Sequence, residues 1–132
     1  MKIKTAELTG RGLNAAVALA LGAKIVKTPE SQSWMFYGPP SLMNGVDPGW
    51  SLQAPDYCSD GLKAMQVLER ECIGLECTGH CWEAYTAIEV ADEDFIVPQF
   101  VSQTGPTSII AIWRCFVTSK LGDEVDIPME LL

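Results

Sequence analysis

The stretch GPTSIIAIWRCFVTSKLG at residues 105–122 decides the fold. Pro106 suits the first turn of a helix, where its missing N–H costs nothing, and Gly122 is a typical stop signal. Between them apolar residues occupy most of the helical circumference, which is the pattern of a buried helix. The stretch therefore predicts a central helix from Thr107 to Leu121. Its narrow open side is expected to hold Arg114, Ser119 and Lys120.

Short strands are expected at both ends of the chain. Val125 and Ile127 alternate with acidic neighbours after the central helix, and Ile3 and Thr5 give the first residues a similar β-branched character. We expect these two terminal strands to pair. An Ala-rich helix should follow the first strand, with Thr9 as its N-cap and Gly22 at its end.

The middle of the chain predicts a second helix and a hairpin. Ser59 or Asp60 can cap the helix, and Gly74 is expected to end it. The expected buried side of this helix consists of Leu62, Met65, Val67, Leu68 and Cys72. Residues 75–77 and 81–90 then alternate like two strands around a short turn, whereas the acidic run 92–94 predicts an exposed loop before an apolar stretch at 95–101.

With 132 residues, the chain is predicted to form a single domain. The pattern predicts an α+β fold, with three helices packed on a small sheet that includes the hairpin and the two terminal strands. Residues 28–57 are expected to form one long connection, because they contain five of the eight prolines and show no sustained period. Its aromatic residues either line an interaction surface or fold back over the core. They are Trp34, Phe36, Tyr37 and Trp50.

The charge of the chain limits its partners. The net charge is −8 and there is no basic run, so direct nucleic-acid binding is not expected. No apolar run is long enough for a membrane-spanning helix, and the first 23 residues make a poor secretory signal because Glu7 interrupts them. Five cysteines without a convincing leader predict reduced thiols in a cytoplasm. The acidic second half is either a contact surface for a protein or a solvated face.

One cluster has the side chains of a metal site. It consists of Cys72, Cys77, His80 and Cys81. Structural zinc sites usually bring together two separated pairs of ligands, whereas these four residues lie within ten positions, so we expect no metal and no cofactor. Metal binding by the four remains the alternative interpretation.

The start of the central helix is a candidate anion site. Gly105, Thr107 and Ser108 precede exposed N–H groups at the positive end of the helix dipole, and Arg114 is expected on the same face. Ordinary helix capping explains the same residues and is the favoured interpretation. No nucleophile with a base and an orienting group can be named, so an enzyme ranks third, after a protein-interaction module and a small-ligand or anion-binding module.

Several segments resemble the NinX-like bacteriophage proteins, a family without assigned function. They are MKIKTAELTG at residues 1–10, Ser59-Asp60, LERE at 68–71, Gly105 to Thr107, Arg114-Cys115 and KLGDEV at 120–125. The resemblance implies a phage or prophage origin, the cytoplasm of a bacterial host and a small α+β domain. It implies no reaction and assigns no residue a role. We therefore expect an accessory protein that binds a host or phage protein, with a homo-oligomer as a further possibility.

Overall fold

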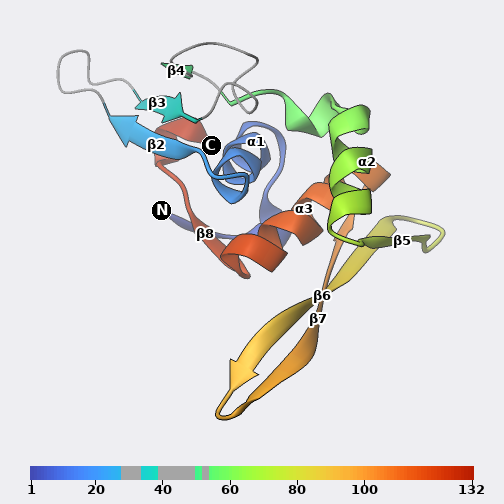
Figure 1. The fold of residues 1–132 in the computed structure, drawn as a ribbon. Coiled ribbons are helices and arrows are strands. Elements are labelled where there is room, and N and C mark those ends of the chain that lie inside the picture. Colours follow the sequence, from blue (N-terminus) through green and yellow to red (C-terminus); the bar gives the residue numbers. More distant parts are fainter. Residues whose placement is uncertain (28–33, 39–49, 52–53) are drawn as a thin grey trace.

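The computed structural model describes residues 1–27, 34–38, 50–51 and 54–132, and its fold is α+β as predicted (Figure 1). Groups of strands separate the three α-helices along the described chain. In order they are β1 (Lys2–Lys4), η1 (Thr5–Glu7), α1 (Gly10–Ala20), β2 (Lys24–Lys27), β3 (Trp34–Tyr37), β4 (Trp50–Ser51), η2 (Tyr57–Ser59), α2 (Gly61–Arg70), β5 (Gly74–Cys77), β6 (Trp82–Asp92), β7 (Phe95–Gly105), α3 (Ser108–Leu121), β8 (Glu124–Asp126) and η3 (Met129–Leu131).

Helix α3 lies at the centre of the fold, as the sequence predicted. Its residues 111–118 are all buried, and it contacts α1, α2, β6 and β7. Trp113 packs edge-on against Tyr57 and Phe116, and its indole N–H donates to the Tyr57 carbonyl at 2.7 Å. The helix begins where the Thr107 hydroxyl accepts from the Ile110 N–H at 3.2 Å. The other elements pack around α3 because its apolar side chains form the centre of the core.

The placement of Arg114 on an open side of this helix was wrong. Arg114 is buried, with only 8% of its surface exposed. The guanidinium donates to the Leu8 carbonyl at 3.0 Å and to the Thr104 carbonyl at 2.8 Å. Burial lowers the pKa of this guanidinium. Arg114 therefore joins the segment before α1 to the end of β7, because a planar group with several donors can serve two carbonyls at once.

Within the described residues the strands form three separate sheets, whereas the sequence predicted one small sheet. The predicted pairing of the chain ends is confirmed, since β1 and β8 are antiparallel with Ile3 opposite Val125. A second sheet has the order β2-β3-β4, and a third has the order β5-β6-β7. The two ends of the chain also meet through the amino group of Met1, which lies 2.8 Å from the Asp126 carboxylate.

The prediction of one long connection at 28–57 was wrong in part. Residues 34–37 form β3, which pairs with β2, and Trp50 and Ser51 form the short β4 beside it. Pairing with β2, which lies outside the segment, stabilises this strand, so a search for internal periodicity could not find it. The predictions that fall on 28–33, 39–49 and 52–53 lie outside the described residues.

Helix α2 begins as predicted but presents a different face to the core. The Asp60 carboxylate accepts from the Lys63 N–H at 3.0 Å. Ala64 and Val67 are buried, whereas the expected core residues Leu62, Met65 and Cys72 are exposed. Gly74 does not end the helix, because it already lies in β5. Cys72 ends it instead with a positive φ of 53°, and the next N–H, of Ile73, returns to the Leu68 carbonyl at 2.9 Å.

Candidate functional site

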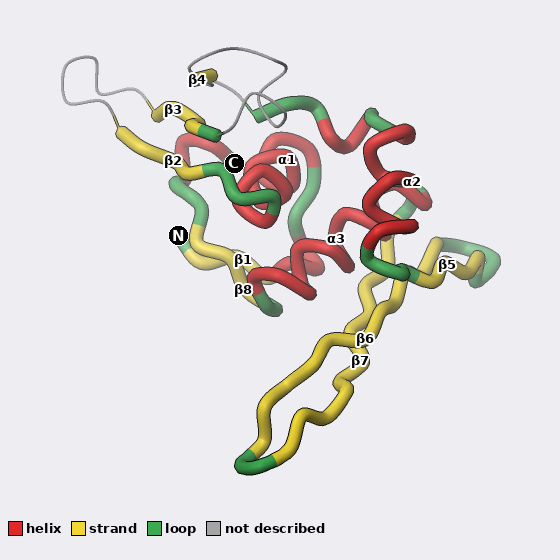
Figure 2. The backbone as a smooth tube through the Cα atoms, viewed as in Figure 1, coloured by secondary structure: helices red, strands yellow, loops and turns green. Residues whose placement is uncertain are grey.

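The most distinctive feature of the fold is a long hairpin that leaves the body. The predicted hairpin of β5 and β6 is confirmed, with Leu75 opposite Ala84. However, β6 continues well past β5 and pairs along its whole length with β7, a strand for which no partner was predicted. Both strands have 11 residues, and their far half extends away from α3 and the other helices (Figures 1 and 2). We call residues 86–101 the arm.

One face of the arm continues the core outward. Residues directly opposite each other in a hairpin share a face, so Thr86 and Val101 lie together near the body. Thr86 is buried and its hydroxyl donates to the Glu71 carbonyl at 3.1 Å. Beyond this point the same face carries apolar side chains with growing exposure towards the tip. They are Ile88, Val90, Val97 and Phe95.

The opposite face of the arm also carries exposed apolar side chains, on either side of the pair Glu89 and Pro98. Phe100 lies opposite Ala87, and Ile96 lies opposite Ala91. Phe100 is 78% exposed and Ile96 is 70% exposed, and on the first face Phe95 near the tip is 74% exposed. Single exposed apolar residues are normal on a surface, but several on both faces of one projecting element are typical of a contact site. Covering each of these three side chains would contribute about 1.5–3 kcal/mol.

The arm has a one-signed charge. Residues 81–113 contain no Lys, Arg or His, although they include five acidic residues. These residues are Glu83, Glu89, Asp92, Glu93 and Asp94. Asp92 is the last residue of β6, and Glu93 and Asp94 form the turn at the tip, where Glu93 has a positive φ of 50°. An apolar surface bordered only by acidic groups favours a partner with basic groups beside an apolar surface.

No protein-family model matches this chain, and no curated protein matches it. The resemblance to the NinX-like phage proteins therefore stays a prediction from the quoted residues. In the part of the chain that the structure describes, no helix has the length and apolar character needed to cross a lipid bilayer.

The residues of the predicted anion site do not present their polar groups together. The Thr107 hydroxyl accepts from the Ile110 N–H, which is ordinary capping. Gly105 is buried at the end of β7, and the guanidinium of Arg114 is bound to two backbone carbonyls. Ser108 is half-buried in the first turn of α3. These contacts describe a junction between β7 and α3.

The aromatic residues of the predicted interaction surface are divided between two faces. Phe36 is buried, whereas Tyr37 is exposed, because consecutive residues of a strand point to opposite sides. Trp34 is half-buried, and the Lys27 ammonium lies 5.4 Å from its ring centre. The side chain of Trp50 lies outside the described residues. The three described side chains therefore do not form one exposed patch.

The four residues of the alternative metal site do not converge. Within the described ranges, no three His, Cys, Asp or Glu side chains come close enough together to hold a metal ion. Cys72 ends α2, Cys77 ends β5, and His80 and Cys81 lie in the turn before β6. The Cys81 thiol lies 3.1 Å from the Thr78 hydroxyl instead. This turn has only local contacts.

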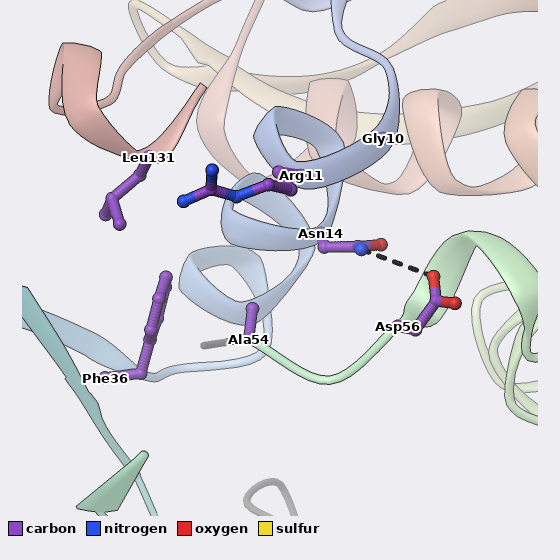
Figure 3. Close-up of a pocket in the computed structure, with 7 residues that line it drawn as sticks. All are labelled: Gly10, Arg11, Asn14, Phe36, Ala54, Asp56 and Leu131. Carbon is purple, nitrogen blue, oxygen red and sulfur yellow. Dashed lines mark hydrogen bonds between the residues drawn. The ribbon is translucent and has the colours of Figure 1, made fainter. Parts of the chain in front are cut away.

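A cavity of about 360 Å³ lies at the start of α1, between Phe36, Leu131 and the segment before η2 (Figure 3). Its polar side chains are engaged with the protein. Arg11 donates to the Glu130 carbonyl at 3.3 Å, and Asn14 donates to Asp56 at 3.3 Å. The Asn14 side-chain oxygen also accepts from a backbone N–H, that of Cys58, at 3.0 Å. The groups of this cavity thus mainly join α1 to its neighbours.

The arm is the site that the sequence reasoning missed. The run 92–94 was predicted to be an exposed loop, and the apolar stretch after it was given no partner. The sequence did contain a signal for the hairpin. Residues 88–90 alternate between apolar and polar side chains, and residues 95–101 are mostly apolar. The two strands extend equally far on either side of a two-residue turn. The turn residues Glu93 and Asp94 lack the usual Asn-Gly or Asp-Gly pattern, which hid the hairpin.

Proposed function

We propose that this chain acts by binding another protein and that the arm, residues 86–101, is its contact surface. The observation that carries the proposal is the exposure of Phe95, Ile96 and Phe100 on an element that projects from the body. A two-stranded hairpin without further packing is only marginally stable in water. A partner that covers both faces would therefore stabilise the arm while the arm supplies apolar contact area.

The charge supports a protein partner over a nucleic acid. Phosphate binding needs Lys and Arg, and the arm carries only acidic groups. An anionic membrane surface is disfavoured for the same reason, although the apolar tip alone would suit one. The resemblance to NinX-like proteins supports, as a further proposal, a phage or prophage accessory protein in a bacterial cytoplasm whose partner is a host or phage protein.

Neither of the other two candidate functions has an observation that favours it. The predicted anion site at 105–108 uses its hydroxyl and guanidinium groups within the fold. For an enzyme, the half-buried Cys58 is a poor nucleophile. Burial first, and then the charge of Asp56, raise the pKa of its thiol.

Site-specific photocrosslinking tests the proposal. A benzoylphenylalanine is placed at Phe100 on the arm, and in a second variant at Leu62 on α2, which is 74% exposed and equally apolar. After irradiation in a lysate of the source cells, mass spectrometry should identify one protein that crosslinks from position 100 and not from position 62. The identified protein should carry basic residues beside the crosslinked position, because the arm carries only acidic ones.

A control variant separates contact from accidental proximity. Replacement of Ile96 by serine in the position-100 crosslinking variant removes apolar contact area without touching the body, so the yield of the crosslink should fall several-fold. Equal capture from positions 62 and 100, or a yield that Ile96→Ser leaves unchanged, would show that the arm is not the contact surface.

A further inference from the structure

The two edges of the arm are unequal. In the third sheet β5 covers only the first part of β6, from Trp82 to Tyr85. The remainder of β6 has β7 on one side, and on the other side the described part of the chain offers it no strand. On its far side β7 is likewise an edge, but it contains Pro98. Natural sheets often protect an edge with proline, because proline removes a donor and obstructs an approaching strand.

The register shows which groups of β6 face the open edge. In an antiparallel hairpin, opposite residues alternate between pairs that exchange hydrogen bonds and pairs that do not. Pro98 lies opposite Glu89 and has no N–H to exchange, so Glu89 and Pro98 form a pair of the second kind. The alternation then directs the N–H and C=O groups of Ala87, Glu89 and Ala91 away from β7. These are odd-numbered residues of β6. Another odd-numbered residue, Cys81, just before β6, also directs its carbonyl away from β7, since it accepts from the Thr78 N–H on the β5 side at 2.9 Å.

We propose that the partner supplies an extended segment that adds to the open edge of β6 between Ala87 and Ala91, in line with β5, and that this segment alternates apolar and basic residues. This inference rests on the proposed function and specifies its binding mode. Main-chain hydrogen bonds give such strand addition its affinity, and the side chains give it specificity.

The side chains of β6 define the composition of that segment. Glu89 lies on one face of the strand, and Ile88 and Val90 lie on the other. A residue directly opposite in an added strand has its Cβ about 4.5–5.5 Å away and points to the same side. A Lys or Arg opposite Glu89 would pair with its carboxylate on one face. Apolar residues on either side of that Lys or Arg would contact Ile88 and Val90 on the other face. A second copy would supply no basic residue from its own arm, since residues 81–113 contain none.

A peptide titration tests strand addition. The probe is a fluorescent seven-residue peptide with blocked ends in which valine and lysine alternate, and its binding is followed by anisotropy. The full chain should bind it saturably. Ala91→Pro removes one outward N–H and leaves the bonds to β7 intact, so it should weaken binding at least about tenfold. The matched variant Ala91→Val keeps the N–H and should bind like the unaltered chain.

The other outcomes overturn the inference in distinguishable ways. Equal binding by Ala91→Pro and Ala91→Val would show that charge alone holds the peptide, and the proposed function would survive if crosslinking from position 100 still succeeds. Absence of saturable binding to the unaltered chain would contradict the segment composition. A dimer in sedimentation that Ala91→Pro dissociates would make a second copy the occupant of the edge.

Discussion

Replacement of Arg114 by leucine is expected to lower the free energy of unfolding by about 3 kcal/mol, because one buried and one partly buried carbonyl would lose a charged donor. Those carbonyls belong to Leu8 and Thr104, at 3.0 and 2.8 Å from the guanidinium. Chemical denaturation followed by tryptophan fluorescence measures the change, since Trp113, the residue before Arg114 in α3, is fully buried. Arg114→Lys should be intermediate, because one ammonium cannot reproduce the planar fork.

The control for this prediction is Arg70→Leu on α2. Arg70 is exposed and, among the described residues, its ion pair is with Glu71 at 3.3 Å, so its removal should change stability by less than about 1 kcal/mol. If Arg114→Leu unfolds at the same denaturant concentration as the unaltered chain, the guanidinium is not a structural link. A role in ligand binding would then deserve the next experiment.

Substitution of Gly105 by alanine should destabilise the chain by about 2–3 kcal/mol, because it overpacks the junction of β7 and α3. A Cβ at this position would lie 2.7 Å from the Ala111 backbone nitrogen and 3.0 Å from Ile110 Cγ2. The first of these neighbours is backbone in the rigid first turns of α3 and cannot move independently. Thermal unfolding should show a fall of several degrees in the midpoint.

Gly61→Ala is the matched control for Gly105→Ala. It lies at the start of α2, and its added Cβ would meet only Ile109 Cδ1 at 3.5 Å, which is ordinary contact. Since alanine has the higher helix propensity, this variant should keep or slightly raise the stability. Equal effects of the two substitutions would contradict the close approach of β7 to α3.

The sequence predicted the elements whose signals are local. The central helix carries its own cap at Thr107 and stop at Gly122, and the paired ends of the chain carry alternating residues, so these were found. The paired strand β3 was missed, because its stability comes from β2 across the connection. The buried position of Arg114 was missed as well, since a guanidinium on an otherwise apolar helix gives no sign of the carbonyls it will meet.

The candidate site was hidden for a related physical reason. An apolar run such as residues 95–101 ordinarily predicts a buried strand, and no sequence rule places such a run outside the body. Only the pairing with β6 beyond the end of β5 shows that the run is exposed. Composition alone could not separate the two interpretations of the aromatic residues at 34–37, because strand alternation buries Phe36 and exposes Tyr37.

Amide hydrogen exchange of β6, followed by NMR, distinguishes an open strand edge from a covered one. In the free chain we expect protection to alternate along the strand. The N–H groups of Ile88 and Val90, which face β7, should be protected, while those of Ala87, Glu89 and Ala91 should exchange rapidly. Equal protection of all five would mean that the edge is already covered. Equal absence of protection would mean that the arm does not form as a paired strand, and either result would contradict a projecting arm with one open edge.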